Sequence, residues 1–178
     1  MRIVAGTARG RTLAAPPGAS TRPTGDKVRG AIFNVLGQFF EGGRVLDLYA
    51  GSGALALEAL SRGCAAATCV ESDPRAADAI RRNAAACGFA GRVEVRREPV
   101  EAALARLQPA TFALAFLDPP YAEGPDAVLG RVGALVVPGG TVVAEHDARR
   151  PPAERDGPLV LADRRRYGTT GISIYRRE

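Results

Sequence analysis

Short apolar runs alternate with longer amphipathic segments along most of the chain. Five of the runs predict strands, at residues 44–49, 66–71, 92–97, 112–117 and 140–146. The segments between them predict helices, at residues 53–63, 73–88, 98–107 and 124–136. Strands that alternate with helices of this length form a parallel sheet covered by helices on both faces.

Both ends of the chain add elements to this core. Residues 1–15 contain two short runs around a turn with glycines, which predicts a β-hairpin, and a loop rich in proline, glycine, serine and threonine follows up to Asp26. Apolar positions at helical spacing then predict a helix from Lys27 to the Gly42-Gly43 pair. Its core-facing side is expected to carry Phe33, Phe39 and Phe40.

The last two runs, at residues 158–167 and 171–177, predict a terminal antiparallel pair of strands. The predicted fold is therefore α/β: an open, doubly wound and mostly parallel sheet of seven strands. We expect a single domain over residues 1–178, with residues 1–26 as an N-terminal extension made of the hairpin and the loop.

Composition excludes several classes of protein. The 178 residues are 46% hydrophobic, which suffices for one well-packed domain, and no apolar run approaches the roughly 18 to 20 residues of a membrane span. The N-terminal residues do not resemble a secretory signal, because arginines interrupt the first apolar stretch. Three cysteines without C-x-x-C spacing and a single histidine, His146, predict reduced core thiols in a cytoplasmic protein and no metal site. We also expect the protein to be a monomer.

Positive charge is concentrated at both ends of the chain. Residues 1–44 hold seven basic and two acidic side chains, residues 45–148 hold nine and thirteen, and residues 149–178 hold eight and four. Basic ends around a mildly acidic middle favour a polyanionic partner such as a nucleic acid. Of the 24 basic residues only Lys27 is a lysine, so a general bias toward arginine also accounts for part of this pattern.

Ligands of doubly wound sheets bind at the carboxyl ends of the parallel strands. The sequence places one acidic residue at or just after the end of each predicted parallel strand: Asp47, Glu71, Glu98, Asp118 and Glu145. All five are expected along one edge of the sheet.

The segment LDLYAGSGALALEAL joins the first strand to a helix through a glycine turn. Gly51 and Gly53 would let a ligand approach the backbone. Glu71 follows Gly51 by twenty residues, at the end of the next strand, where a carboxylate accepts hydrogen bonds from both hydroxyls of a ribose.

This spacing also fits the dinucleotide-binding fingerprint loosely, so a nicotinamide-dependent oxidoreductase is one alternative and a plain strand–helix turn is another. However, Asp47 puts a carboxylate just before the glycines, where it suits a cationic, amine-bearing ligand better than a pyrophosphate. We therefore favour S-adenosylmethionine, with its ribose at Glu71, its adenine near Glu98 and its methionine end near Asp47.

The segment FALAFLDPPY, residues 112–121, ends a buried strand with an acid, two prolines and a tyrosine. An exocyclic nucleobase amine must pyramidalise to attack a sulfonium methyl group, and acceptors beside its N–H bonds favour that change. Asp118 and the carbonyl of Pro119 would supply two acceptors on a stiff support, and Tyr121 a ring on which a flipped-out base stacks. A simple turn is the alternative explanation of the two prolines.

These motifs resemble a known family. DPPY after an apolar strand is similar to the methyltransferases that modify adenine or guanine amines in DNA and RNA. With RIVAGTARGRTL, RPTGDKVRGAIFNVL and VLDLYAGSGALALEALSRG in this order, the chain resembles the bacterial 16S ribosomal RNA guanine-N2 methyltransferases over nearly its whole length. The resemblance implies a Rossmann-like class I methyltransferase that uses S-adenosylmethionine. It also implies guanine 966 of 16S ribosomal RNA as the target, in free RNA or in a partly assembled small subunit.

The resemblance also assigns roles to residues. It implies that Asp47, Gly51, Gly53 and Glu71 bind S-adenosylmethionine, and that Asp118, Pro119 and Tyr121 hold the target guanine. An RNA-contacting approach to the site would be lined by Arg22, Thr24, Lys27 and Arg29. The arginines of the predicted hairpin, Arg2, Arg9 and Arg11, are further candidate phosphate contacts. The family usually has arginine where Lys27 stands and an acid where Gly30 stands.

Three alternatives remain open at this point. A DNA or RNA adenine-N6 methyltransferase shares the same chemistry, although a DNA enzyme normally carries a target-recognition domain for which we expect no room here. A nucleotide-binding module or oxidoreductase would bind NAD in place of S-adenosylmethionine. A non-catalytic RNA-binding assembly factor would keep the fold without transferring a methyl group.

Overall fold

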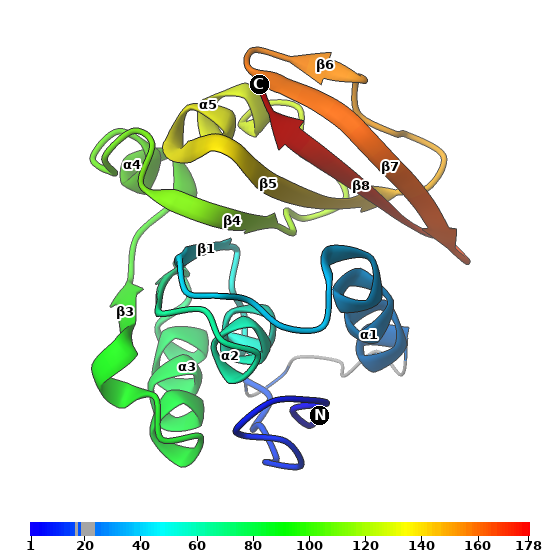
Figure 1. Cartoon of the computed structure of the whole chain (residues 1–178). Helices are drawn as coiled ribbons and strands as arrows, with labels where there is room; N and C mark the ends of the chain where they lie inside the picture. Colours follow the sequence, from blue (N-terminus) through cyan, green and yellow to red (C-terminus); the bar gives the residue numbers. More distant parts are fainter. Residues whose placement is uncertain (17, 19–23) are drawn as a thin grey trace.

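The computed structural model describes residues 1–16, 18 and 24–178 of the chain (Figure 1). Within these residues eight strands form one sheet, in the order β3-β2-β1-β4-β5-β8-β7-β6. The strands are β1 (Arg44–Leu48), β2 (Ala66–Val70), β3 (Val93–Arg96), β4 (Phe112–Leu117), β5 (Val136–Asp147), β6 (Arg155–Asp156), β7 (Leu159–Tyr167) and β8 (Thr170–Arg177).

Helices cover both faces of this sheet (Figure 1). On one side lie α1 (Thr24–Leu36), α2 (Ala54–Ser61) and α3 (Pro74–Ala86), and on the other α4 (Val100–Leu104) and α5 (Leu129–Leu135); a short 3₁₀ helix, η1 (Ala90–Arg92), precedes β3. Each side has its own apolar core, one around Phe33, Leu57 and Phe116 and the other around Leu117 and Leu129. The predicted doubly wound α/β fold is confirmed.

The strand register places the carboxyl ends of the central parallel strands at one level. Strands β3, β2, β1, β4 and β5 are parallel, and β8 joins β5 antiparallel. Leu48 of β1 lies opposite Leu117 of β4, which in turn lies opposite Ala144 of β5. Because neighbouring parallel strands end at the same level, the residues that follow them meet at one edge of the sheet.

Two features of the sheet and helices differ from the prediction. The two residues of β6 add an eighth strand to the expected seven, and a strand this short has no periodic pattern to detect. In the predicted helix at residues 124–136 only Leu129–Leu135 is α-helical, because Gly124 has a φ of +66° and the residues that follow it form a turn.

The helix predicted to reach Gly42-Gly43 ends earlier than expected. Helix α1 stops at Leu36, and Gly37 follows with a φ of +104°, which takes the chain out of the helical path. Phe33 is fully buried and Phe40 packs against the core, but Phe39 is 69% exposed. The expectation that Phe39 belongs to the core is wrong, because it lies beyond the helix whose periodicity suggested it.

The N-terminal segment forms a short hairpin that is held on the helices. An antiparallel bridge joins Arg2 and Thr12, and across it Leu13 donates its N–H to the carbonyl of Met1 at 2.9 Å and Ile3 donates to the carbonyl of Arg11 at 3.0 Å, although the pairing is too short to be assigned as strands. The hairpin is tied to the helices because Thr7 donates its N–H to the backbone oxygen of Ser61 in α2 at 2.8 Å, and Asn83 of α3 exchanges two hydrogen bonds with the backbone of Ala14. Figure 1 shows the segment lying beside α2 and α1.

Neither a membrane-spanning helix nor a metal-binding cluster is found among the described residues. No helix among them is both long and apolar enough to cross a membrane. The same residues contain no cluster of potential metal ligands, and His146 is a buried core histidine whose ring nitrogens contact the carbonyl of Asp147 at 2.8 Å and the hydroxyl of Ser173 at 2.9 Å. Burial lowers the pKa of His146.

Candidate active site

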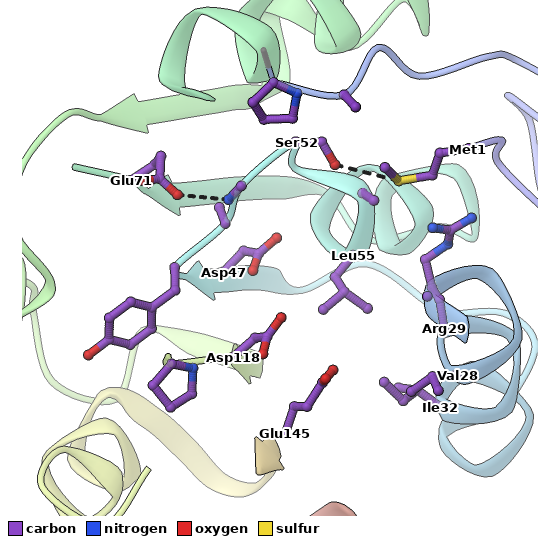
Figure 2. Close-up of a pocket in the computed structure, with 18 of the residues that line it drawn as sticks. Met1, Val28, Arg29, Ile32, Asp47, Ser52, Leu55, Glu71, Asp118 and Glu145 are labelled. Carbon is purple, nitrogen blue, oxygen red and sulfur yellow. Dashed lines mark hydrogen bonds between the residues drawn. The ribbon is translucent and has the colours of Figure 1, made fainter. Parts of the chain in front are cut away.

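A cavity of about 790 Å³ opens at the carboxyl ends of the central parallel strands. One half is formed by the end of β1, the turn that follows it and the residues after β2; its residues are Asp47, Tyr49, Ala50, Gly51, Ser52, Ala54, Leu55, Glu71 and Ser72. The other half is formed by the residues after β4, by Glu145 of β5 and by Thr170 of β8, and α1 closes the side opposite the sheet. Figure 2 shows Asp47, Asp118 and Glu145 in a row that faces Val28, Arg29 and Ile32 of α1.

Glu71 fixes the position of the glycine turn after β1 by a hydrogen bond. One oxygen of its carboxylate accepts the N–H of Gly51 at 2.9 Å, and the other accepts the N–H of Asp73 at 2.9 Å (Figure 2). Gly51 has a φ of +57°, and Tyr49, just before the turn, has the rare value of +61° for a residue with a side chain. Strained backbone of this kind is concentrated at ligand sites, and Tyr49 lines the cavity.

Asp47 lies in the floor of the cavity with only 2% of its surface exposed. Its carboxylate accepts the N–H of Ala56 at 3.2 Å in the first turn of α2. Burial raises the pKa of Asp47 well above its ordinary value of 3.8; the hydrogen bond from Ala56 opposes this, and the charges of Asp118 and Glu71 add to it. Several carboxylates gathered at one cavity favour a bound cation.

Two of the predicted cofactor residues lie outside the wall of this cavity. Gly53 is buried behind the turn, with a φ of +76°, and a Cβ there would meet Ile80 at 3.1 Å, so the absence of a side chain lets the turn pack on α3; a contact of Gly53 with the cofactor stays a prediction. Glu98 forms ion pairs with Arg106 and Arg96, which hold its carboxylate away from the cavity. The residues after it, Pro99, Val100 and Glu101, line a second cavity of about 240 Å³.

This second cavity adjoins the first and shares Tyr49, Glu71 and Ser72 with it. It extends the cofactor half toward β3 and α4, as the adenine of S-adenosylmethionine would require. The adenine contact expected near Glu98 stays a prediction; the neighbouring Pro99, Val100 and Glu101 line this cavity, whereas the carboxylate of Glu98 pairs with two arginines.

The acceptor half of the cavity is built by the DPPY segment. Asp118 and Tyr121 are half-buried and Pro119 is buried, and all three line the cavity. The hydroxyl of Tyr121 lies 2.8 Å from the hydroxyl of Thr170 in β8 and donates to the carboxylate of Glu145 at 3.3 Å. The tyrosine ring is thus fixed by two other strands of the sheet.

The wall opposite the sheet carries one arginine. Arg29 is only 4% exposed, and its guanidinium lies 3.2 Å from the carboxylate of Asp26 and 3.8 Å from that of Glu58. It also donates to the carbonyl of Arg2 at 2.5 Å, which ties α1 to the N-terminal segment. An RNA contact by Arg29 stays a prediction, and it would require these ion pairs to open.

The other predicted RNA-contacting residues lie in different surroundings. Arg2, Arg9, Arg11 and Lys27 are exposed, as phosphate contacts must be. Thr24 is the first residue of α1, and Arg22 lies outside the described residues.

Some residues of the site had no assigned role from sequence alone. Glu145 is expected at the edge of the sheet but has no predicted role there. Tyr49 and Ser52 belong to the turn in which only the glycines were assigned a role. Thr170 lies 49 residues after Tyr121, which it contacts. The position of Tyr49, directly before the Ala50–Gly53 turn, is a local signal that could have placed its side chain in the site. No local pattern points to Thr170, because its contact with Tyr121 depends on the antiparallel return of β8 beside β5.

The chain is similar to known proteins along nearly its whole length. The family model described as Conserved hypothetical protein 95 matches residues 1–176 of the chain. A Bacillus subtilis protein named "Putative rRNA methyltransferase YlbH" is 41% identical over 182 residues, covering 99% of both chains. The Haemophilus influenzae protein named "Ribosomal RNA small subunit methyltransferase D" is 30% identical over 182 residues, covering 99% of this chain and 92% of that relative.

Solved structures show the same architecture. The Escherichia coli structure named "Putative methyltransferase yhhF" is 30% identical, superposes with a TM-score of 0.85, and covers 100% of this chain and 98% of its own. An RNA methyltransferase of Salinibacter ruber, solved in complex with S-adenosyl-L-homocysteine, is 19% identical with a TM-score of 0.65 over 88% of this chain and 94% of its own, and shares the fold.

Proposed function

The chain belongs to the Conserved hypothetical protein 95 family, together with the ribosomal RNA small subunit methyltransferase D proteins that it matches along its length, and from this premise we propose its reaction. It transfers a methyl group from S-adenosylmethionine to the exocyclic N2 amine of a guanine in small-subunit ribosomal RNA. The fold, a mostly parallel Rossmann-like sheet, is that of the methyltransferases to which the chain is similar.

The observation that carries this proposal is the position of Asp118 in the same cavity as Asp47, the glycine turn and Glu71. Asp118 follows β4, directly beside β1, whose end carries Asp47 and the glycine turn. A base amine held at Asp118 would therefore lie at the boundary between the two halves of the cavity. Methyl transfer requires this arrangement, because nucleophile and methyl group must approach within about 3–3.5 Å in line.

The cofactor half fits S-adenosylmethionine in charge and shape. Bound there, this cofactor supplies an activated methyl group on a positively charged sulfur. Asp47 and the neighbouring carboxylates compensate its sulfonium and ammonium charges, and Glu71 can accept hydrogen bonds from the ribose while it keeps the N–H of Gly51. The apolar edge at Pro99 and Val100 suits the adenine ring.

The acceptor half fits an exocyclic amine. The carboxylate of Asp118 and the carbonyl of Pro119 accept the N–H bonds of the amine, which favours a pyramidal nitrogen and stabilises the positive charge that develops on it. Tyr121, fixed by Thr170 and Glu145, presents its ring to a base that has left its stack. The proton released after transfer needs no strong base, because an N-methylated base ammonium is acidic.

The proposal also covers the target nucleotide, the form of the substrate and the RNA contacts. The target is guanine 966 of 16S ribosomal RNA, offered in a partly assembled small subunit or in the RNA itself, and the enzyme acts as a cytoplasmic monomer. The exposed Arg2, Arg9, Arg11 and Lys27 would contact the phosphates that flank the target.

The test is transfer of a labelled methyl group from S-adenosylmethionine, with under-methylated small subunits, naked 16S ribosomal RNA and duplex DNA offered in parallel. We expect label in a guanine N2 of the subunit or its RNA, and loss of that label in Asp118→Ala with cofactor binding retained. Label in adenine N6 or in DNA would contradict the proposal. Binding of NAD without binding of S-adenosylmethionine would favour an oxidoreductase instead.

A further inference from the structure

We propose that Glu145 selects guanine as the target base by accepting a hydrogen bond from its N1–H, beside the N2 amine that Asp118 holds. This inference rests on the proposed function and adds a specificity-determining residue to it. The evidence is the position of Glu145 in the sheet, its place in the cavity and the hydrogen-bonding pattern of the purine bases.

The sheet register puts Asp118 and Glu145 side by side. Leu117 of β4 lies opposite Ala144 of β5, so the next residue of each strand, Asp118 and Glu145, meet at the same level. Adjacent strands are about 4.8 Å apart, and residues at paired positions point to the same face. Figure 2 shows both carboxylates directed toward the cavity.

Glu145 belongs to the acceptor half rather than the cofactor half. In the sheet order, β4 separates β5 from β1 and β2, which carry Asp47, the glycine turn and Glu71. The carboxylate of Glu145, on β5, therefore lies beyond Asp118 from the cofactor, where the rest of the target base must extend.

The Glu145 carboxylate is held in a defined position. Tyr121 donates its hydroxyl to one oxygen at 3.3 Å, and Tyr121 is itself fixed by Thr170 at 2.8 Å. The side chain is half-buried and lines the cavity. A carboxylate accepts hydrogen bonds on both of its oxygens, and each oxygen can accept more than one.

The purine bases differ in what they would present to this carboxylate. On its Watson–Crick edge guanine has two adjacent donors, the N2 amine and N1–H. Adenine has one amine beside N1, which is an acceptor. Asp118 alone would serve either amine, whereas Glu145 would be attracted by the N1–H of guanine and repelled by the N1 lone pair of adenine. Two neighbouring carboxylates thus match a base with two neighbouring donors.

The test uses 2-aminopurine, which keeps the C2 amine of guanine but has no hydrogen on N1. Small subunits are reconstituted with 16S ribosomal RNA carrying guanine or 2-aminopurine at the target position, and single-turnover methylation is measured for each. The unsubstituted enzyme should prefer guanine by about tenfold or more, as expected for one hydrogen bond to a charged group. Glu145→Gln should bring the two rates to within about threefold, because its amide accepts from guanine and donates to 2-aminopurine.

Thr170→Val serves as the matched control. It removes the other hydrogen bond of Tyr121 and leaves Glu145 in place, so both bases should react more slowly by the same factor and the preference should persist. If Glu145→Gln slows both bases equally and keeps the preference, Glu145 only supports Tyr121 and the proposal is overturned. Absence of methyl transfer to guanine by the unsubstituted enzyme would overturn the proposed function, and the selectivity proposal with it.

Discussion

The carboxylate of Glu71 accepts the backbone N–H of Gly51 at 2.9 Å and so joins the end of β2 to the glycine turn after β1. Its second oxygen accepts the N–H of Asp73, the N-cap of α3, whose own carboxylate accepts the N–H of Arg75 at 2.9 Å. One side chain thereby positions the turn, the start of α3 and the ribose-facing acceptors of the proposed cofactor site.

Glu71→Ala should weaken binding of S-adenosylmethionine about 10- to 100-fold, because it removes both the ribose acceptors and the support of the turn. Isothermal titration calorimetry would measure the change. Glu98→Ala is the matched control: its carboxylate pairs with Arg106 and Arg96 away from the cavity, so affinity should change less than about twofold. Equal losses in the two variants would contradict the cofactor site described here.

Asp118→Asn tests the roles of the cofactor half and the acceptor half separately. The variant should bind S-adenosylmethionine within about threefold of the unsubstituted enzyme, because the contacts proposed for the cofactor come from Asp47, Glu71 and the glycine turn, and Asp118 belongs to the acceptor half. Methyl transfer should fall by about 100-fold or more, since an amide supports the developing positive charge on the amine far less than a carboxylate does. Single-turnover rates at saturating cofactor, with calorimetry on the same samples, would measure both. Retained methylation would remove Asp118 from the reaction.

The buried carboxylate of Asp47 predicts two pH effects. Folding raises its pKa above 3.8, mainly through burial, so the folded protein keeps a proton that the unfolded chain has lost. The free energy of unfolding of the ligand-free protein should therefore decrease as the pH rises through the window that starts near 3.8. Affinity for S-adenosylmethionine should increase through the same window, because a cationic ligand favours the ionised carboxylate.

Asp47→Asn should remove both pH effects, since an amide does not titrate and its oxygen can still accept the N–H of Ala56. Thermal unfolding of the ligand-free proteins should give a higher Tm for the variant at pH 7, and the difference should shrink toward pH 4. Calorimetry across the same pH range tests the second effect. A steep pH dependence of affinity that survives in Asp47→Asn would assign it to another group.

Much of the site could be predicted from sequence because its signals are local. A strand followed by an acid is visible in a short window, and parallel strands end at a common edge, so Asp47, Glu71, Asp118 and Glu145 were all expected there. Glu98 is expected there by the same reasoning, but it is not among the residues that line either cavity. The pattern predicts where β3 ends but cannot tell which side chain of the following EPVE turns toward the ligand, and the ion pairs of Glu98 with two arginines decide this.

The rest of the site depends on contacts distant in sequence. Glu58 lies in α2 among apolar residues, and nothing in the local pattern identifies its partners, yet it is completely buried. The N-terminal segment covers it and donates the N–H groups of Val4 and Ala5 to its carboxylate, at 2.8 and 3.0 Å. The long-range bond between Tyr121 and Thr170 is equally invisible to a local pattern.

Glu58 also provides the sharpest stability prediction. Its carboxylate accepts from Arg62 at 2.8 Å and lies 3.8 Å from Arg29, so one buried acid neutralises two buried arginines and holds the N-terminal segment on α2. Glu58→Ala should lower the free energy of unfolding by about 3–5 kcal/mol, because it leaves buried charges and backbone N–H groups without their acceptor. Urea unfolding would measure this.

Asp78→Ala is its matched control. Asp78 forms an ion pair with Arg81 at the same 2.8 Å, but both side chains are at least half exposed, so its loss should cost less than about 1 kcal/mol. In Glu58→Ala, amide hydrogen exchange of Val4 and Ala5 should rise well before global unfolding, because their acceptor is gone while the sheet persists. Similar costs for the two variants would mean that the N-terminal segment is held by its apolar contacts, such as those of the buried Ile3, and not by Glu58.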